Sequence, residues 1–202
     1  AMDPAISGGA TPGSGMKGYW VKIGTTSGDD DILADFWVGN VLLWTTAPAL
    51  TPDGTYYLSV RAEDNVSNKG PWATGSVLID TTAPGNPSDL DVTTPTNDTT
   101  PEVTWTEATD PGYPESGSGV VDYEVQIGTT MGGFDVIAWT SVGNIAMFDD
   151  AAWAALGVTL TPDDEYFFQV RAVDAVGLTS IGAAEVSIVV DTARPVLSNG
   201  SP

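Results

Sequence analysis

Acidic side chains are the largest group of residues in this 202-residue sequence that could do chemistry. Asp and Glu number 27 against 6 Lys and Arg, which gives a formal net charge of −21. Carboxylate oxygens and backbone carbonyls are the ligands that calcium takes from loops, and crowded carboxylates repel one another unless a cation neutralises them. No EF-hand spacing is present, so a calcium site has to be assembled from separate loops. The candidate ligands are Asp29, Asp30, Asp31, Asp53, Asp80, Asp110 and Glu115, with Asp174 as an additional carboxylate.

Composition excludes most catalytic chemistries. The sequence contains no His and no Cys, which rules out a Ser-His-Asp triad, a Cys nucleophile, a thiolate or imidazole zinc site and a disulfide. It also lacks a Gly-rich phosphate loop and a G-x-S-x-G motif. Among so many acids, some pair will lie at the separation used by glycosidases by chance alone. We therefore expect no catalytic residue and no enzymatic activity.

Two classes of partner are excluded by charge and hydropathy. Binding to a nucleic acid requires a basic face, and the six Lys and Arg residues are too few and too scattered to form one. No segment approaches the roughly 20 apolar residues that a membrane-spanning helix needs. We therefore expect neither nucleic-acid binding nor membrane insertion.

An internal repeat organises the chain and positions the acids. The first matching pair has the sequences YWVKIGTT and YEVQIGTT. The second copy carries a six-residue insertion near residues 148–155. Residues 149–156 of this insertion are rich in Ala and carry the only helical signal. Self-similarity over this length indicates two modules. The matching pairs are residues 19–26 with 123–130, 51–64 with 161–174, and 80–84 with 191–195.

Hydrophobic alternation predicts that both modules are built from β-strands. Tyr123, Val125 and Ile127 alternate with polar residues such as Gln126, which places the apolar set in a core and the polar set in water. The matching pattern near the end of the second module places Gln169 on the outer face as well. Turn clusters rich in Pro, Gly and Asp separate these segments. The expected fold class is all-β.

One longer motif, Leu-x-Pro-x3-Tyr-x3-Val-x-Ala, recurs in both modules. It is present at Leu50, Pro52, Tyr56, Val60 and Ala62, and again at Leu160, Pro162, Tyr166, Val170 and Ala172. On this motif both modules resemble the fibronectin type III domain, a seven-stranded immunoglobulin-like β-sandwich with sheets A-B-E and C-C′-F-G. Trp105 stands where that family has a Trp on strand B. The resemblance implies a tyrosine corner at Tyr56 and Tyr166, in which the hydroxyl hydrogen-bonds to the backbone of the loop that enters strand F.

Aligned on this pattern, the first module begins inside its B–C loop and lacks strands A and B. The apolar face of its remaining sheet would then be exposed to water, which costs about 25 cal/mol per Å². We expect either that a second copy covers this face, giving a homodimer by strand exchange, or that the module is truncated and its exposed sheet is hidden only by lattice contacts. The expected organisation is a vector remnant and a Gly-rich partial B–C loop at 1–18, a truncated module with strands C to G at 19–80, a linker at 81–85, a complete module at 86–191, and a linker to a further module at 192–202.

The strand order of the resembled fold predicts where the acids meet. Strand G ends at the pole that carries the C–C′ and E–F loops, which brings the first module's acids toward Asp80, while the second module would supply Asp110 across the joint. Calcium is therefore the candidate cofactor, and it would stiffen the junction. The alternative is that these acids point apart into solvent, because Asp is common in loops simply for its turn preference.

Four Trp residues lie outside the repeated core pattern and suggest a second kind of binding. Exposed aromatic faces beside carboxylates bind carbohydrate in many folds, although a Trp of this kind more often packs under a loop or against a neighbouring domain. The residues concerned are Trp20, Trp44, Trp72 and Trp153.

Together these features predict a non-catalytic spacer or adhesive module of a larger bacterial or archaeal protein, located outside the cell or on its surface. Its partner would be a protein or a cell-surface polysaccharide. The alternative is a carbohydrate-binding or accessory module of a secreted enzyme that degrades polysaccharides. A sandwich fold alone does not separate these functions.

Overall fold

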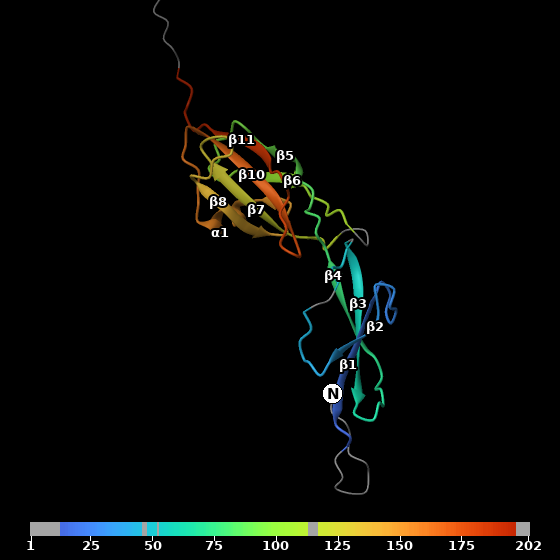
Figure 1. The fold of residues 1–202 in the computed structure, drawn as a ribbon. Coiled ribbons are helices and arrows are strands. Elements are labelled where there is room, and N and C mark those ends of the chain that lie inside the picture. The colour runs from blue at the N-terminus through green and yellow to red at the C-terminus, as the bar shows by residue number, and fades with distance from the viewer. Residues whose placement is uncertain (1–12, 46–47, 52, 113–116, 197–202) are drawn as a thin grey trace, which may run out of the picture. The chain divides into compact units, whose positions relative to one another are not determined.

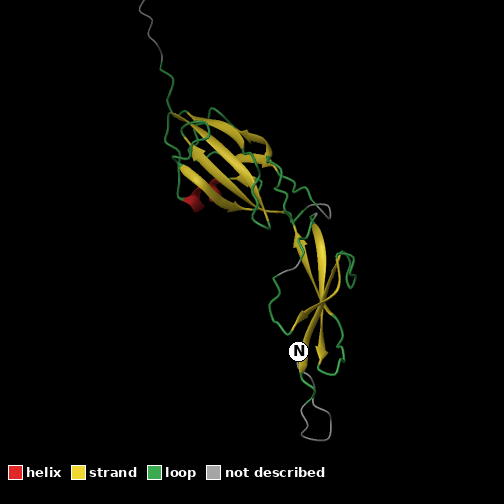
Figure 2. Cartoon of the chain, viewed as in Figure 1, coloured by secondary structure: helices red, strands yellow, loops and turns green. Residues whose placement is uncertain are grey.

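The computed structural model describes residues 13–45, 48–51, 53–112 and 117–196. The chain divides into unit 1, Ala1–Asp80, and unit 2, Thr81–Pro202. Nearly all the regular structure in both units is β-strand, with a single short helix in the described part of unit 2 (Figure 2). None of the described helical segments is long and apolar enough to span a membrane.

Unit 1 is one antiparallel sheet of four strands in the order β2-β1-β3-β4 (Figure 1). Within the described residues, no second sheet lies on either of its faces. The sheet is held in register by pairs such as Val21 with Val60 and Tyr56 with Val77. Its strands are β1 (Met16–Gly24), β2 (Leu33–Gly39), β3 (Gly54–Asp64) and β4 (Ala73–Ile79).

Unit 2 contains the same four-stranded sheet and a second, smaller one. The order β8-β7-β10-β11 repeats that of unit 1 with β7, β8, β10 and β11 in place of β1, β2, β3 and β4. The second sheet has the order β5-β6-β9. The strands are β5 (Ser88–Val92), β6 (Val103–Thr106), β7 (Val120–Gly128), β8 (Ile137–Gly143), β9 (Met147–Phe148), β10 (Asp164–Asp174) and β11 (Ala184–Val190).

The core of unit 2 lies between its two sheets. Tyr123, Val125 and Ile127 of β7 are all buried, as the alternation predicts, and Trp105 of β6 contributes to the core from the opposite sheet. The ring of Trp105 lies 5.6 Å from that of Tyr123, in the tilted geometry that aromatic pairs favour. The two sheets therefore close into a sandwich around one core.

The outward polar residues of this sheet differ from the sequence expectation. Gln126 and Gln169 were expected in water, but both are buried. The Gln126 amide donates to the Gln169 side chain at 3.3 Å and to the Gly132 carbonyl at 3.1 Å. Cross-strand amide pairing satisfies these groups without solvent, which an alternation of apolar and polar residues cannot reveal.

The insertion of unit 2 folds into the helix α1 (Asp150–Leu156). Asp149 caps it by accepting hydrogen bonds from Ala151 and Ala152, and Gly157 ends it in the left-handed conformation at φ 67°. The helix places Trp153, which is fully buried, edge-on against Phe148. The Trp153 indole donates to the Pro101 carbonyl at 2.9 Å, so this residue is part of the core.

Candidate functional site

The loop between β1 and β2 carries the first three predicted calcium ligands. Asp31 accepts a hydrogen bond from the Thr25 backbone N–H and another from the Thr25 hydroxyl, both at 2.8 Å. These two bonds hold the pKa of Asp31 below its usual value. Asp29 accepts a hydrogen bond from the Thr26 hydroxyl. Two of the three carboxylates therefore accept hydrogen bonds from residues of their own loop.

Unit 2 repeats this arrangement between β7 and β8. Asp135 accepts hydrogen bonds from the Thr129 hydroxyl at 2.7 Å and the Thr129 backbone at 2.9 Å, and they lower its pKa in the same way. A Thr and an Asp six residues later thus close the loop in both units. The role of Asp31 in unit 1 is that of a loop-closing residue.

The structure does not gather the acids of unit 1 into one cluster. Asp29, Asp30, Asp31 and Asp53 belong to no group of three metal-capable side chains among the described residues. Asp53 precedes β3, whose first residue pairs with the last residue of β4, directly before Asp80. Glu115 lies outside the described residues.

In unit 2, two acidic side chains meet at the end where β10 leaves the sheet. Carboxylate oxygens of Asp110 and Asp174 lie within 4.8 Å of each other, and both residues are buried. The Gly119 backbone donates to Asp110 Oδ2 at 2.7 Å, and the Gly119 carbonyl accepts from the Ala175 N–H at 3.0 Å. Gly119 thus ties the loop before β7 to the loop after β10.

The chain packs directly against the Asp110 carboxylate at Gly117. This residue has φ 54°, and a Cβ placed on it would lie 2.6 Å from Asp110 Oδ2. A side chain at this position would therefore displace the carboxylate, so glycine is required by both conformation and space. The sequence signal for this site was the Gly-rich stretch that follows Asp110, but its partner Asp174 comes from a distant part of the chain.

All three residues predicted to be structural are buried. Tyr166 is buried, and its hydroxyl accepts from the Thr161 N–H at 3.0 Å, which is the geometry of a tyrosine corner. Tyr56 is likewise buried in unit 1, and Trp105 is buried in the core of unit 2. These three residues contribute to the packing of the sheets.

The outer face of the unit 1 sheet carries aromatic rings, but cations cover them. Lys69 Nζ lies 4.4 Å from the centre of the Trp20 ring, and the Arg61 guanidinium lies 4.2 Å from that of Trp72. The Trp20 indole also donates to Glu63 at 2.6 Å. Cation–π contacts of this kind stabilise a sheet surface. They occupy ring faces that a sugar would need.

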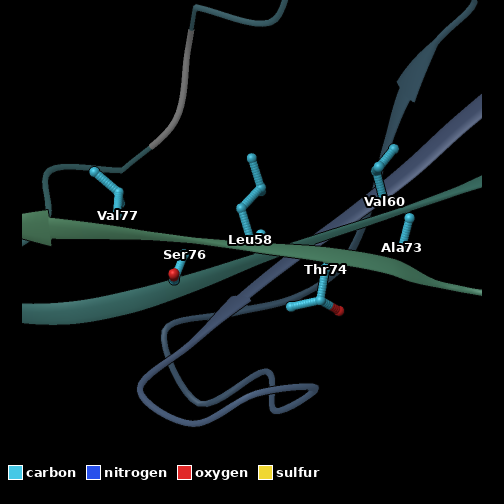
Figure 3. A pocket seen from close by; sticks show the side chains of 7 residues that line it. Leu58, Val60, Ala73, Thr74, Ser76 and Val77 are labelled. Carbon is cyan, nitrogen blue, oxygen red and sulfur yellow. The ribbon is translucent and has the colours of Figure 1, made fainter.

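The opposite face of the unit 1 sheet is apolar and partly uncovered. Val21, Ile23 and Tyr56 on this face are buried, whereas other apolar side chains on it are exposed. Leu58, Val60 and Val77 point to one side of the sheet, whereas Thr74 and Ser76 point to the other (Figure 3). The three apolar side chains are 43%, 38% and 45% exposed. They line a shallow hollow over the sheet.

A second shallow hollow lies on the same face, next to the segment that follows β2. It is lined by Tyr19 and Val21 from β1 and by Val41, Leu42 and Trp44 from the segment after β2. That segment matches the stretch of unit 2 that forms β9, which pairs with β6. In the described part of unit 1 it forms no strand, and Leu42 is 95% exposed.

Comparison with solved structures places the fold among fibronectin type III-like and immunoglobulin-like modules. The FN1–FN3 domains of chicken CNTN1 match with a TM-score of 0.52 at 17% sequence identity, over 88% of this chain and 56% of that one. The chain thus spans little more than half the length of that structure. The prediction of an all-β fold of fibronectin type III type is confirmed.

A weaker structural match is the spore cortex lytic enzyme SleM of Clostridium perfringens. Its TM-score is 0.34 at 14% identity, over 52% of this chain and 28% of that one, and it carries no argument. No protein-family model matches the sequence, and no curated protein matches it either.

Proposed function

We propose that this chain is a non-catalytic structural and adhesive part of a larger protein that acts outside the cell or on its surface. The fibronectin type III-like fold supports this role, because such sandwiches present surfaces on a rigid scaffold. The absence of His and Cys from the sequence agrees with a function that needs no nucleophile or general base near neutral pH.

The uncovered face of unit 1 is the observation that carries the adhesive part of this proposal. Its counterparts in unit 2, Phe168 and Ile188 among them, are fully buried beneath the sheet β5-β6-β9. Exposed apolar faces of this kind mark contact sites for another surface. We assign that surface to the same face of a second copy of the chain.

Packing of one copy against another fits the chemistry of the face. Two sheets pack face to face about 10 Å apart when both inner faces are apolar, as they do inside a sandwich. A twofold axis brings the same patch of both copies together, so a single apolar face is sufficient. Leu58 and Val77 would then contact apolar side chains of the partner copy.

Sedimentation velocity at micromolar concentration in 0.15 M salt tests this assignment. We expect a dimer for the native chain and a monomer for Leu58→Glu, because a charge at the centre of the face has to be desolvated on association. Ile181→Glu adds the same charge at a position of unit 2 that is 99% exposed, and it should leave the dimer intact. If the native chain stays monomeric while its apolar face binds other proteins, the assignment of this face to a second copy is wrong.

Carbohydrate binding is the alternative function, and the Trp side chains of unit 1 are its only support. It is the less favoured because Lys69 and Arg61 lie over Trp20 and Trp72, and because Trp153 is buried. Retarded migration in native gels that contain polysaccharide, abolished by Trp72→Ala, would favour this alternative instead.

A further inference from the structure

One carboxylate oxygen of unit 2 is buried without a donor. Asp174 is only 2% exposed. Its Oδ1 accepts from the Val176 N–H at 3.0 Å and the Leu178 N–H at 2.8 Å, but its Oδ2 has no hydrogen-bond partner in the described part of the chain. No Lys or Arg among the described residues forms a salt bridge with it. Burying a carboxylate oxygen in this state is costly unless something neutralises it.

Unit 1 contains the same turn and shows how the second oxygen can be satisfied. Asp64, the counterpart of Asp174, accepts from the Val66 and Asn68 backbones at 3.0 and 2.8 Å. Its Oδ2 accepts from the Asn68 side-chain amide at 2.8 Å. Leu178 occupies the position of Asn68 in unit 2 and has no group to donate. The turn is thus conserved between the units, while the donor to Oδ2 is absent in unit 2.

Asp110 adds a second buried carboxylate at the same place. Its oxygens approach those of Asp174 within 4.8 Å, and the main chain at Gly117 and Gly119 holds it there. Two buried carboxylates this close repel one another. Two carboxylates that can act as metal ligands therefore lie close together, and main-chain N–H groups hold each of them in place.

We propose that Asp110 and Asp174 of unit 2 bind a calcium ion. Only oxygen donors are available, which excludes the metals that prefer nitrogen or sulfur. Calcium accepts carboxylates and backbone carbonyls from irregular loops, whereas magnesium demands a near-ideal octahedron. The ion would supply the positively charged partner that Asp174 Oδ2 lacks. It would also join the loop before β7 to the loop after β10.

Calorimetric titration of the chelator-treated 202-residue chain with calcium chloride in 0.15 M KCl tests the site. We expect saturable binding of one ion per chain. Asp174→Asn and Asp110→Asn should each weaken it by about tenfold or more, because each removes a charged ligand.

Two further variants separate a built site from general attraction to an acidic surface. Asp64→Asn removes the same charge from the matching turn of unit 1 and should leave the affinity unchanged. Leu178→Asn restores the amide donor found in unit 1, so it should weaken calcium binding without removing a charge. Equal losses in Asp64→Asn and Asp174→Asn, or no saturable binding up to about 10 mM calcium, would overturn the proposal. These results are independent of whether unit 1 dimerises.

Discussion

The four-stranded sheets of unit 1 and unit 2 have the same strand order, and they differ in what lies on their inner faces. In unit 2 the sheet β5-β6-β9 and Trp153 cover Phe168, Val170 and Ile188, all fully buried. In unit 1 the corresponding side chains are about two-fifths exposed or more. The comparison teaches that strand pairing and register are properties of the sheet itself, whereas burial depends on a second layer.

Large-to-small substitution at one matched position should give the largest difference between the units. Phe168→Ala is expected to destabilise unit 2 by about 3–5 kcal/mol, since it leaves a cavity in a closed core. Leu58→Ala, its counterpart in unit 1, should cost about 1 kcal/mol or less while the face is open to solvent. Urea unfolding at concentrations low enough to keep the chain monomeric provides the measurement. Equal losses at both positions would mean that unit 1 has a covered core.

The outer faces give a second comparison with a smaller expected effect. Lys69→Met in unit 1 removes a charge over Trp20 while it keeps the aliphatic stem, and it should cost about 0.5–1 kcal/mol. Lys69→Arg should retain the contact and most of the stability. Thermal unfolding followed by Trp fluorescence measures both variants. A Met variant as stable as the native chain would show that the ring gains nothing from the cation.

The loop-closing acids provide the smallest effect, and here the two units should behave alike. The pKa values of Asp31 and Asp135 are lowered by hydrogen bonds from Thr25 and Thr129. A lowered pKa in the folded state means that each carboxylate stabilises the fold above its unfolded pKa near 3.8. This contribution is lost as the pH falls through the folded-state pKa.

Carboxyl-carbon NMR titration of the two residues tests this expectation. Both should titrate below 3.8, and the protein should lose stability as the medium is acidified through that range. Asn replacement at either position should make the stability of its own unit less sensitive to acid. If Asp31 titrates with an ordinary pKa, the hydrogen bonds from Thr25 do not act on it as those from Thr129 act on Asp135.

The candidate site was only partly predictable, for reasons that differ from residue to residue. Asp110 and Asp174 were both candidate carboxylates, but nothing in the sequence indicates that Asp174 Oδ2 lacks a donor while Asp64 Oδ2 has one. Asp31 carried the same composition signal, yet its own loop uses its oxygens. The sequence identifies side chains that can act as ligands, but it does not show which of them already accept hydrogen bonds.

The sequence by itself determined the strands, their inward residues and the equivalence of the two sheets. Alternation at Tyr123, Val125 and Ile127 is a local property, because successive side chains of an extended backbone point to opposite faces. Only the tertiary structure decided that Gln126 is buried against Gln169, that Trp153 enters the core, and that Asp110 meets Asp174. Each of these contacts joins segments far apart in the chain, and their geometry depends on how whole sheets and loops pack.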